Sequence, residues 1–201
     1  MTREELAARF KNAGASVIAA QDELTEIDSH FGDADHGITM TRIAGAVAGA
    51  VEAAGGDIRS MLDDAAMAVM MINGGSAVPL WNTWLDGLSV SAPAADSMTA
   101  GEIKTMFSGA LSALSALSKA KVGDKTMMDA LIPATEALCA AEGTEDELFA
   151  AAARAAEEGA EATKNFVSRF GRARSYGEQT IGTPDAGAVS MKYFFVGLAK
   201  K

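Results

Sequence analysis

The chain has 201 residues, of which 49% are hydrophobic and only 6% aromatic, and these proportions suit one globular domain, residues 1–201, with a largely aliphatic core. The formal net charge of −10 argues against a general nucleic-acid or anionic-membrane surface, because either partner would need a basic face. The single cysteine, Cys139, excludes an internal disulfide.

The N-terminal segment predicts a long helix over residues 2–29. Leu6 and Phe10 recur at helical spacing behind a capping box in which Thr2 faces Glu5. This opening is not a basic and then apolar leader, and no apolar run in the chain approaches the ~20 residues that span a bilayer. We therefore expect a cytoplasmic protein that does not insert into a membrane.

Three carboxylates and two imidazoles follow within the segment that runs from Asp28 to Gly37. Asp33 and Asp35 can both turn toward one centre if the backbone is extended, and carboxylate oxygens are the ligands that Mg²⁺ prefers. Asp28 lies at the predicted end of a helix, where an acid is disfavoured unless a cation compensates. A solvated turn in which Asp35 caps the next helix is the alternative; we favour a metal site because three neighbouring acids repel one another. His36 is interpreted either as a hydrogen-bonding structural residue or as a contact to a nucleotide or substrate.

Seven further helices are predicted, and no segment has the pattern of a strand. Capping boxes at Thr99 and Thr144, and N-cap positions at Asp57, Asp124 and Asp185, mark several of their starts. The predicted ranges are 38–54, 58–72, 76–91, 99–120, 125–141, 145–168 and 187–199. The predicted fold class is therefore all-α, an eight-helix antiparallel up-and-down bundle or barrel.

The connections between these helices alternate between two kinds. Every second connection is rich in charged residues or in glycine, and we call these the chemically loaded connections. They are the acidic cluster and residues 73–76, 121–126 and 171–187. Because successive connections of an up-and-down bundle alternate between its ends, all four should gather at one end, which we predict to be the site. Helix N-termini and flexible glycines at that end suit a phosphate group. Arg172 is interpreted either as a phosphate ligand or as a partner of helix carbonyls.

Several motifs together resemble the nucleotide-binding L subunit, or L domain, of dihydroxyacetone kinase, over nearly the whole chain. They are Leu24–Asp28 followed by Gly32–Gly37, Gly123–Leu131, Gly171–Ala173, Gly177-Glu178, and Ile181-Gly182 leading to Asp185–Ser190. The resemblance implies an eight-helix antiparallel barrel that holds a nucleotide, ADP or ATP, and two Mg²⁺ ions at one end.

The resemblance also implies roles for individual residues. Asp28, Asp33 and Asp35 would hold the two Mg²⁺ ions, and Arg172 would join them in neutralising the phosphoryl group during its transfer. The residues implied around the nucleotide are His36, Gly37, Ile38, Thr39, Ala77, Val78, Met127, Arg172, Asp185, Ala186 and Gly187.

In the family that this chain resembles, the ketose is held by a histidine of a separate K subunit or domain. We therefore expect the chain to dock its loaded end onto a K-type partner that carries a small ketose, and to bind nucleotide without phosphorylating a sugar alone. Exchangeable ATP or a phosphocarrier protein could supply the phosphate. The chain could also form a homodimer. The alternatives are a nucleotide-binding regulator without turnover and a two-metal phosphohydrolase that acts alone.

The sequence departs from the family pattern mainly around the nucleotide. Ala34 replaces the central glycine of the acidic motif, and Ala77 and Val78 replace a serine and a glycine. Thr39 stands in place of an asparagine, and Trp81 in place of a tyrosine. The expected metal ligands match the family pattern, whereas several residues expected around the nucleotide differ from it. We therefore interpret the chain as a divergent paralogue.

Overall fold

The computed structural model describes all 201 residues, and it contains nine α-helices and two 3₁₀-helices without a β-strand. The predicted all-α class is confirmed. None of the helices combines the length and hydrophobicity that a membrane-spanning segment needs. The elements are α1 (Arg3–Ala19), α2 (Gln21–Ser29), α3 (His36–Ala53), α4 (Ile58–Met70), α5 (Ala77–Ser91), α6 (Ala100–Leu117), α7 (Met128–Ala140), α8 (Glu145–Ala162), η1 (Thr163–Asn165), η2 (Arg172–Thr180) and α9 (Ala186–Leu198).

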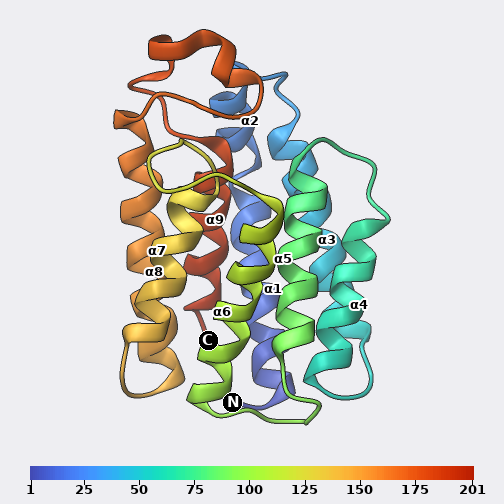
Figure 1. Ribbon diagram of the computed structural model, residues 1–201. Helices are drawn as coiled ribbons and strands as arrows, with labels where there is room; N and C mark the ends of the chain where they lie inside the picture. The colour runs from blue at the N-terminus through green and yellow to red at the C-terminus, as the bar shows by residue number, and fades with distance from the viewer.

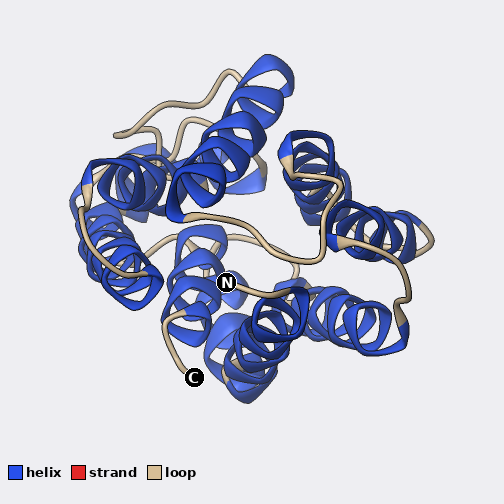
Figure 2. Cartoon of the chain, turned by 90° about the horizontal axis from the view of Figure 1, so that it is seen from below, coloured by secondary structure: helices blue, strands red, loops and turns tan.

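The helices form a closed antiparallel barrel. From α3 onward each long helix packs against the next one in the chain, and α1 packs against both α3 and α9, which closes the ring. The view along the helices shows this ring (Figure 2). α1 and α2 together occupy one position in it, so the eight-helix up-and-down arrangement is confirmed.

The first helix differs from the prediction because it breaks at Ala20, where the backbone N–H reaches back only three residues, to the Val17 carbonyl. The break lets α2 lean against the start of α3. The two helices meet at Gly37, where a Cβ atom would collide with the Gln21 carbonyl and the Thr25 hydroxyl. Neither Pro nor Gly lies at the break. We therefore attribute it to this contact between α2 and α3 rather than to a local sequence signal.

Three other boundaries differ from the predicted ranges by three to six residues, all at the same end of the barrel. The helix predicted over 99–120 ends at Leu117, that over 145–168 ends at Ala162, and that over 125–141 begins only at Met128. Asp124 is therefore not an N-cap. Instead, the Asp129 carboxylate accepts hydrogen bonds from the Gly123 and Thr126 backbone N–H groups, both at 2.6 Å, and holds residues 123–126 in a turn. The capping boxes at Thr2, Thr99 and Thr144 and the caps at Asp57 and Asp185 are confirmed.

A cluster of aromatic side chains fills the centre of the barrel. Trp81, Trp84 and Phe194 make mutual edge-to-face contacts with ring centroids 5.2–5.6 Å apart, and Phe107 and Phe195 extend the cluster toward α8. All five are nearly inaccessible to solvent. Such pairs add about 0.5–1.5 kcal/mol each beyond the burial of their area, so the barrel is a firm support for the loops at its end.

The four chemically loaded connections lie together at one end of the barrel, at the top of Figure 1, as predicted. They join α2 to α3, α4 to α5, α6 to α7, and α8 to α9; the last, residues 163–185, includes η1 and η2 and covers that end. The N-terminus lies at the opposite end (Figure 1).

Candidate functional site

The three predicted metal ligands converge in the structure. Asp28 lies in the last turn of α2, Asp33 lies in the following turn, and Asp35 lies at the N-cap position of α3. One oxygen of each carboxylate lies within 4.8 Å of the others, a spacing that a metal ion could bridge. Asp28 Oδ2 accepts hydrogen bonds from the Asp35 and His36 backbone N–H groups, and a Cβ atom at Gly32 would collide with the Asp28 carboxylate. These contacts hold the Asp28 carboxylate in place beside the start of α3.

Ala34 occupies the left-handed region of the backbone, with φ of 59°, between Asp33 and Asp35. A side chain in this region costs roughly 1–2 kcal/mol relative to glycine, whereas glycine costs more entropy on folding. We expect Ala34→Gly to raise the free energy of unfolding by up to about 1 kcal/mol, measured by urea denaturation. The matched control is Ala8→Gly, at an exposed helical position of α1, where the same change should lower the free energy of unfolding by about 1 kcal/mol. Equal effects of the two substitutions would contradict the strain at Ala34.

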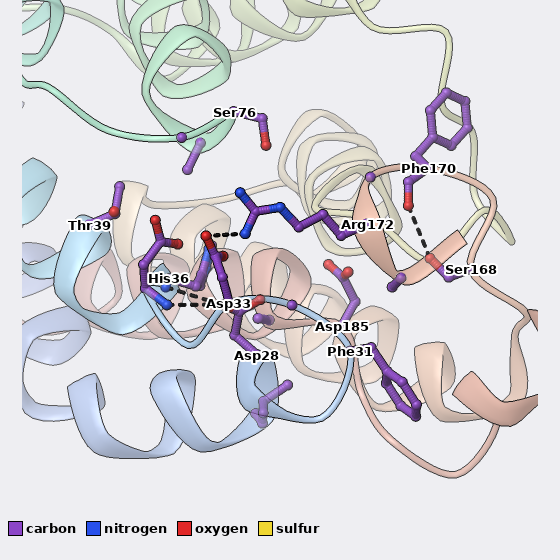
Figure 3. A pocket seen from close by; sticks show the side chains of 18 residues that line it. Asp28, Phe31, Asp33, His36, Thr39, Ser76, Ser168, Phe170, Arg172 and Asp185 are labelled. Carbon is purple, nitrogen blue, oxygen red and sulfur yellow. Dashed lines mark hydrogen bonds and ion pairs between the residues drawn. The ribbon is translucent and has the colours of Figure 1, made fainter. Parts of the chain in front are cut away.

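Arg172 faces the acidic cluster from the opposite side of the cavity. It begins η2, and its guanidinium forms an ion pair with Asp33, which Figure 3 shows reaching across the opening. The hydrogen bond and charge of Arg172 lower the pKa of Asp33, and burial followed by the charges of Asp33 and Asp28 raises the pKa of Asp35. One cation therefore neutralises part of the cluster, and uncompensated negative charge remains on it.

His36 joins the acidic loop to α9. Its Nε2 lies 2.7 Å from the Ser190 hydroxyl, and that hydroxyl donates its own proton to the Ala186 carbonyl at 2.8 Å. The ring nitrogen must therefore be the donor to Ser190. Burial lowers the pKa of His36, so the ring is neutral at pH 7. His36 therefore makes the hydrogen bond expected of a structural residue, and it also lines the cavity, so its contact with a nucleotide stays a prediction.

The cavity has a charged half and an apolar half. The charged half, about 510 Å³, contains the three aspartates and Arg172. The apolar half, about 470 Å³, is lined by side chains that include Leu80, Trp81 and Met127. The two halves share the residues His36, Ser76, Ala77, Phe170, Gly171 and Asp185. The site could therefore hold an elongated ligand with an anionic end and a flat apolar end.

Asp185 lies where the two halves meet and caps α9. Its carboxylate accepts a hydrogen bond from the Ala188 backbone N–H at 2.8 Å, and its own N–H donates to the Thr163 hydroxyl. The side chain can be reached from the cavity, yet enough protein surrounds it that burial raises its pKa to about 7. Gly187 lets the turn pass close to Met127, whose backbone N and Cβ lie 3.3 Å from where a Cβ atom would be.

The structure brings together most, though not all, of the residues implied for the nucleotide site. Those that line the cavity are His36, Thr39, Ala77, Met127, Arg172, Asp185, Ala186 and Gly187. Gly37 is buried against α2, Val78 is buried under Gly74, and Ile38 is 45% exposed outside the cavity, so these three do not line it.

Sequence reasoning missed two residues at the cavity. Ser76 lines both halves one position before Ala77, so a hydroxyl is present there although Ala77 lacks one. The sequence does contain this signal, as a serine displaced by one residue. Lys125 also lines the apolar half, but the sequence gives no sign that its ammonium points away from the cavity into a group of carbonyls.

Comparison with known proteins relates this chain to several kinases and kinase subunits. A family model described as the DAK2 domain matches residues 30–200. The chain is 31% identical over 205 residues to the ADP-binding subunit DhaL of the PEP-dependent dihydroxyacetone kinase of Escherichia coli K12, with 99% of this chain and 97% of that subunit covered. It is 36% identical over 193 residues to the D-erythrulose kinase of Mycolicibacterium smegmatis, with 92% of this chain covered but only 33% of that kinase. The chain thus spans about a third of one relative and almost all of the other.

A solved structure shares the fold. The dihydroxyacetone kinase from C. freundii, in complex with AMP-PNP and Mg²⁺, matches 96% of this chain and 33% of its own chain, with a TM-score of 0.74 and 22% sequence identity. This match shows that the all-α barrel is the same in both.

Proposed function

Because this chain belongs to the DAK2 domain family, we propose that it is the nucleotide-binding, phosphoryl-transferring subunit of a kinase for dihydroxyacetone or a related short ketose. The observation that carries the proposal is the cavity in which three carboxylates face one guanidinium beside an apolar pocket. Its relatives include a kinase subunit of nearly the same length and a domain-sized part of an erythrulose kinase.

The charged half of the cavity fits two Mg²⁺ ions and a polyphosphate. Asp28, Asp33 and Asp35 offer six carboxylate oxygens, a hard anionic set of the kind that holds Mg²⁺ together with substrate phosphates. When bound, the ions supply neutralisation of charge on the transferring group. The role of the acids is to hold the ions, and the role of Arg172 is to leave Asp33 and bind the phosphate oxygens.

The apolar half fits the base of ADP or ATP. Trp81 forms part of its wall, with Met127 and Leu117 from the α6–α7 side. Base and phosphates then occupy the two halves, and His36, Ser76 and Asp185 lie between them near the sugar and the first phosphates. The α3, α5 and α9 N-termini meet the cavity at His36, Ala77 and Ala186, and the positive ends of their dipoles favour phosphate there.

Transfer to a sugar requires a second protein in this proposal, because the chain supplies the nucleotide side of the reaction. Apolar side chains stand exposed on the loops and helix ends around the cavity, as expected of a docking face for the K-type ketose-binding partner. They are Ile38, Met70, Met71, Leu117, Val122, Phe170, Tyr176 and Ile181. The ADP left after transfer would either exchange for ATP or be phosphorylated in place by a phosphocarrier protein.

The decisive experiment measures phosphate transfer with and without a partner. We expect the purified chain to bind Mg-ADP and to phosphorylate dihydroxyacetone or erythrulose only when a K-type subunit and a phosphate donor are added. The mass of any nucleotide that co-purifies, and its exchange with added ATP, distinguish the donors: retained ADP that does not exchange indicates a phosphocarrier.

Three other outcomes would contradict the proposal. Robust ketose phosphorylation by the chain alone would remove the need for a partner. Nucleotide binding without turnover with any K-type partner would indicate a regulator. Metal-dependent release of phosphate by the chain alone would indicate a phosphohydrolase.

A further inference from the structure

Lys125 has a buried ammonium that the nucleotide site does not use. Only 4% of the residue is exposed, and Nζ lies within hydrogen-bond distance of four backbone carbonyls. These belong to Thr163 at 2.7 Å, Phe166 at 3.2 Å, Thr180 at 2.8 Å and Thr183 at 2.5 Å. An ammonium has three protons, so all three are used and the longest contact is shared. Lys125 therefore has no proton left to donate to a phosphate.

The four carbonyls flank the segment that carries Arg172. Thr163 and Phe166 precede it, and Thr180 and Thr183 follow it. A single side chain thus joins the two ends of the excursion between residues 166 and 180, at the tip of which the exposed guanidinium reaches Asp33. This excursion has mostly exposed side chains, so side-chain burial alone does little to fix its position.

Other hydrogen bonds also tie this segment to itself and to its neighbours. The Ser168 N–H donates to the Thr180 hydroxyl, the Asp185 N–H donates to the Thr163 hydroxyl, the Gly182 N–H donates to the Lys164 carbonyl, and the Arg169 N–H donates to the Asp124 carbonyl. The last of these comes from the same turn as Lys125. Removal of the ammonium would leave the Phe166 and Thr183 carbonyls without a donor, while the Thr163 and Thr180 carbonyls would keep only the backbone N–H groups of Phe166 at 3.1 Å and Thr183 at 3.4 Å. This loss is costly unless the segment moves to let water reach the carbonyls.

The backbone at Lys125 is shaped for this contact. Its φ is 60°, in the left-handed region that a residue with a side chain rarely adopts, and the Asp129 carboxylate holds the turn on either side of it. Burial lowers the pKa of Lys125, and the charges of Asp185 and Asp129 oppose that effect. The carbonyl dipoles and these two acids offset the cost of burying the charge.

We propose that Lys125 is a positioning residue for Arg172: its ammonium closes the base of the segment 163–185 and so sets where the guanidinium stands opposite the three aspartates. The role of Arg172 toward phosphate rests on the proposed function, whereas the ordering of the segment by Lys125 does not. Thr126 and Met127 follow Lys125 in the chain and line the apolar half of the cavity. The same turn therefore connects the wall of the apolar half to the segment 163–185.

Lys125→Met, which keeps the length of the side chain and removes the ammonium, tests the proposal. By hydrogen exchange of the ligand-free protein, we expect amides of residues 163–185 to exchange at least ~10-fold faster, with those of α1 and α5 unchanged. The matched control is Lys121→Met, an exposed lysine of the same loop, which should change neither. Unchanged exchange at 163–185 in Lys125→Met would overturn the proposal, even if the protein bound no nucleotide.

A double-mutant cycle tests the link to Arg172. Arg172→Ala should weaken Mg-ADP binding about 10-fold in the wild-type background and less than ~3-fold in the Lys125→Met background, because the guanidinium is already misplaced there. Equal losses in both backgrounds would refute the coupling. Lys125→Gln, which retains two donors, is the second variant should Lys125→Met not fold. Global unfolding of both variants would count against a local positioning role.

Discussion

Asp33→Ala and Asp35→Ala should each weaken Mg-ADP binding by at least ~100-fold, or about 2.7 kcal/mol, while the helical fold stays intact. Each substitution removes a charged ligand from a cluster in which one oxygen of each carboxylate lies within 4.8 Å of the others, and two acids offer too few ligands for the two ions that we propose. Neither carboxylate supports the core, since both residues lie on an exposed turn. Titration calorimetry with Mg-ADP and circular dichroism at 222 nm measure the two effects.

The matched control for the acidic cluster is Asp63→Ala, which removes the same charge from an exposed position on α4 away from the cavity. It should leave Mg-ADP affinity within ~2-fold of wild type. The two cluster variants should also differ from each other in the absence of metal. Asp33→Ala frees Arg172, so binding of ADP without Mg²⁺ should be stronger in it than in Asp35→Ala. Wild-type Mg-ADP affinity in either variant would refute the metal assignment.

The architecture could be predicted from the sequence because its signals are local. Capping boxes at Thr2, Thr99 and Thr144 fix where helices start. Because successive connections alternate between the two ends of an up-and-down bundle, the chemically loaded connections then lie at one end. The same reasoning brought Asp28, Asp33 and Asp35 together because they lie close in the chain. For Arg172, only the parity of the loops and the family resemblance gave a place near them.

The parts that sequence reasoning missed depend on contacts between distant segments. The break at Ala20 follows from the approach of α2 to Gly37, and the late start of α7 follows from the turn that Asp129 closes. The four backbone carbonyls that accept hydrogen bonds from Lys125 belong to residues up to 58 positions away in the chain. Nothing in the sequence around Lys125 specifies such partners. Loop-borne contacts of this kind also decide which residues line the cavity.

The departures from the family pattern at residues 76–78 affect the cavity less than a comparison of the motifs alone suggests. Ala77 lacks a hydroxyl, but Ser76 lines both halves of the cavity next to it, and its hydroxyl does not cap α5. Val78 is buried away from the cavity, so its added bulk does not reduce the space for phosphate. The departures from the family pattern therefore leave the charged half intact and alter mainly the wall beside it.

Arg172→Ala should lower turnover with a K-type partner by about 10³-fold, and Arg172→Lys should recover little of it. A guanidinium that stabilises a transferring phosphoryl group contributes factors of about 10³–10⁵ in other phosphoryl-transfer enzymes, and its planar fork cannot be reproduced by an ammonium. The loss of Mg-ADP affinity should be only about 10-fold, because the ions and the apolar half still bind the nucleotide. Steady-state kinetics and calorimetry separate the two effects.

A second readout of Arg172 does not depend on catalysis. Since the Arg172 guanidinium pairs with Asp33 and so competes with a metal ion for that carboxylate, its removal should strengthen binding of Mn²⁺ alone, measured by electron paramagnetic resonance. Arg154→Ala, on an exposed position of α8, is the matched control and should change neither turnover nor Mn²⁺ binding. If Arg172→Ala binds Mn²⁺ more tightly yet keeps turnover within ~3-fold of wild type, Arg172 is only a counter-ion of the three aspartates and takes no part in transfer. If both change as expected, the same guanidinium serves the aspartates before binding and the phosphate during the reaction.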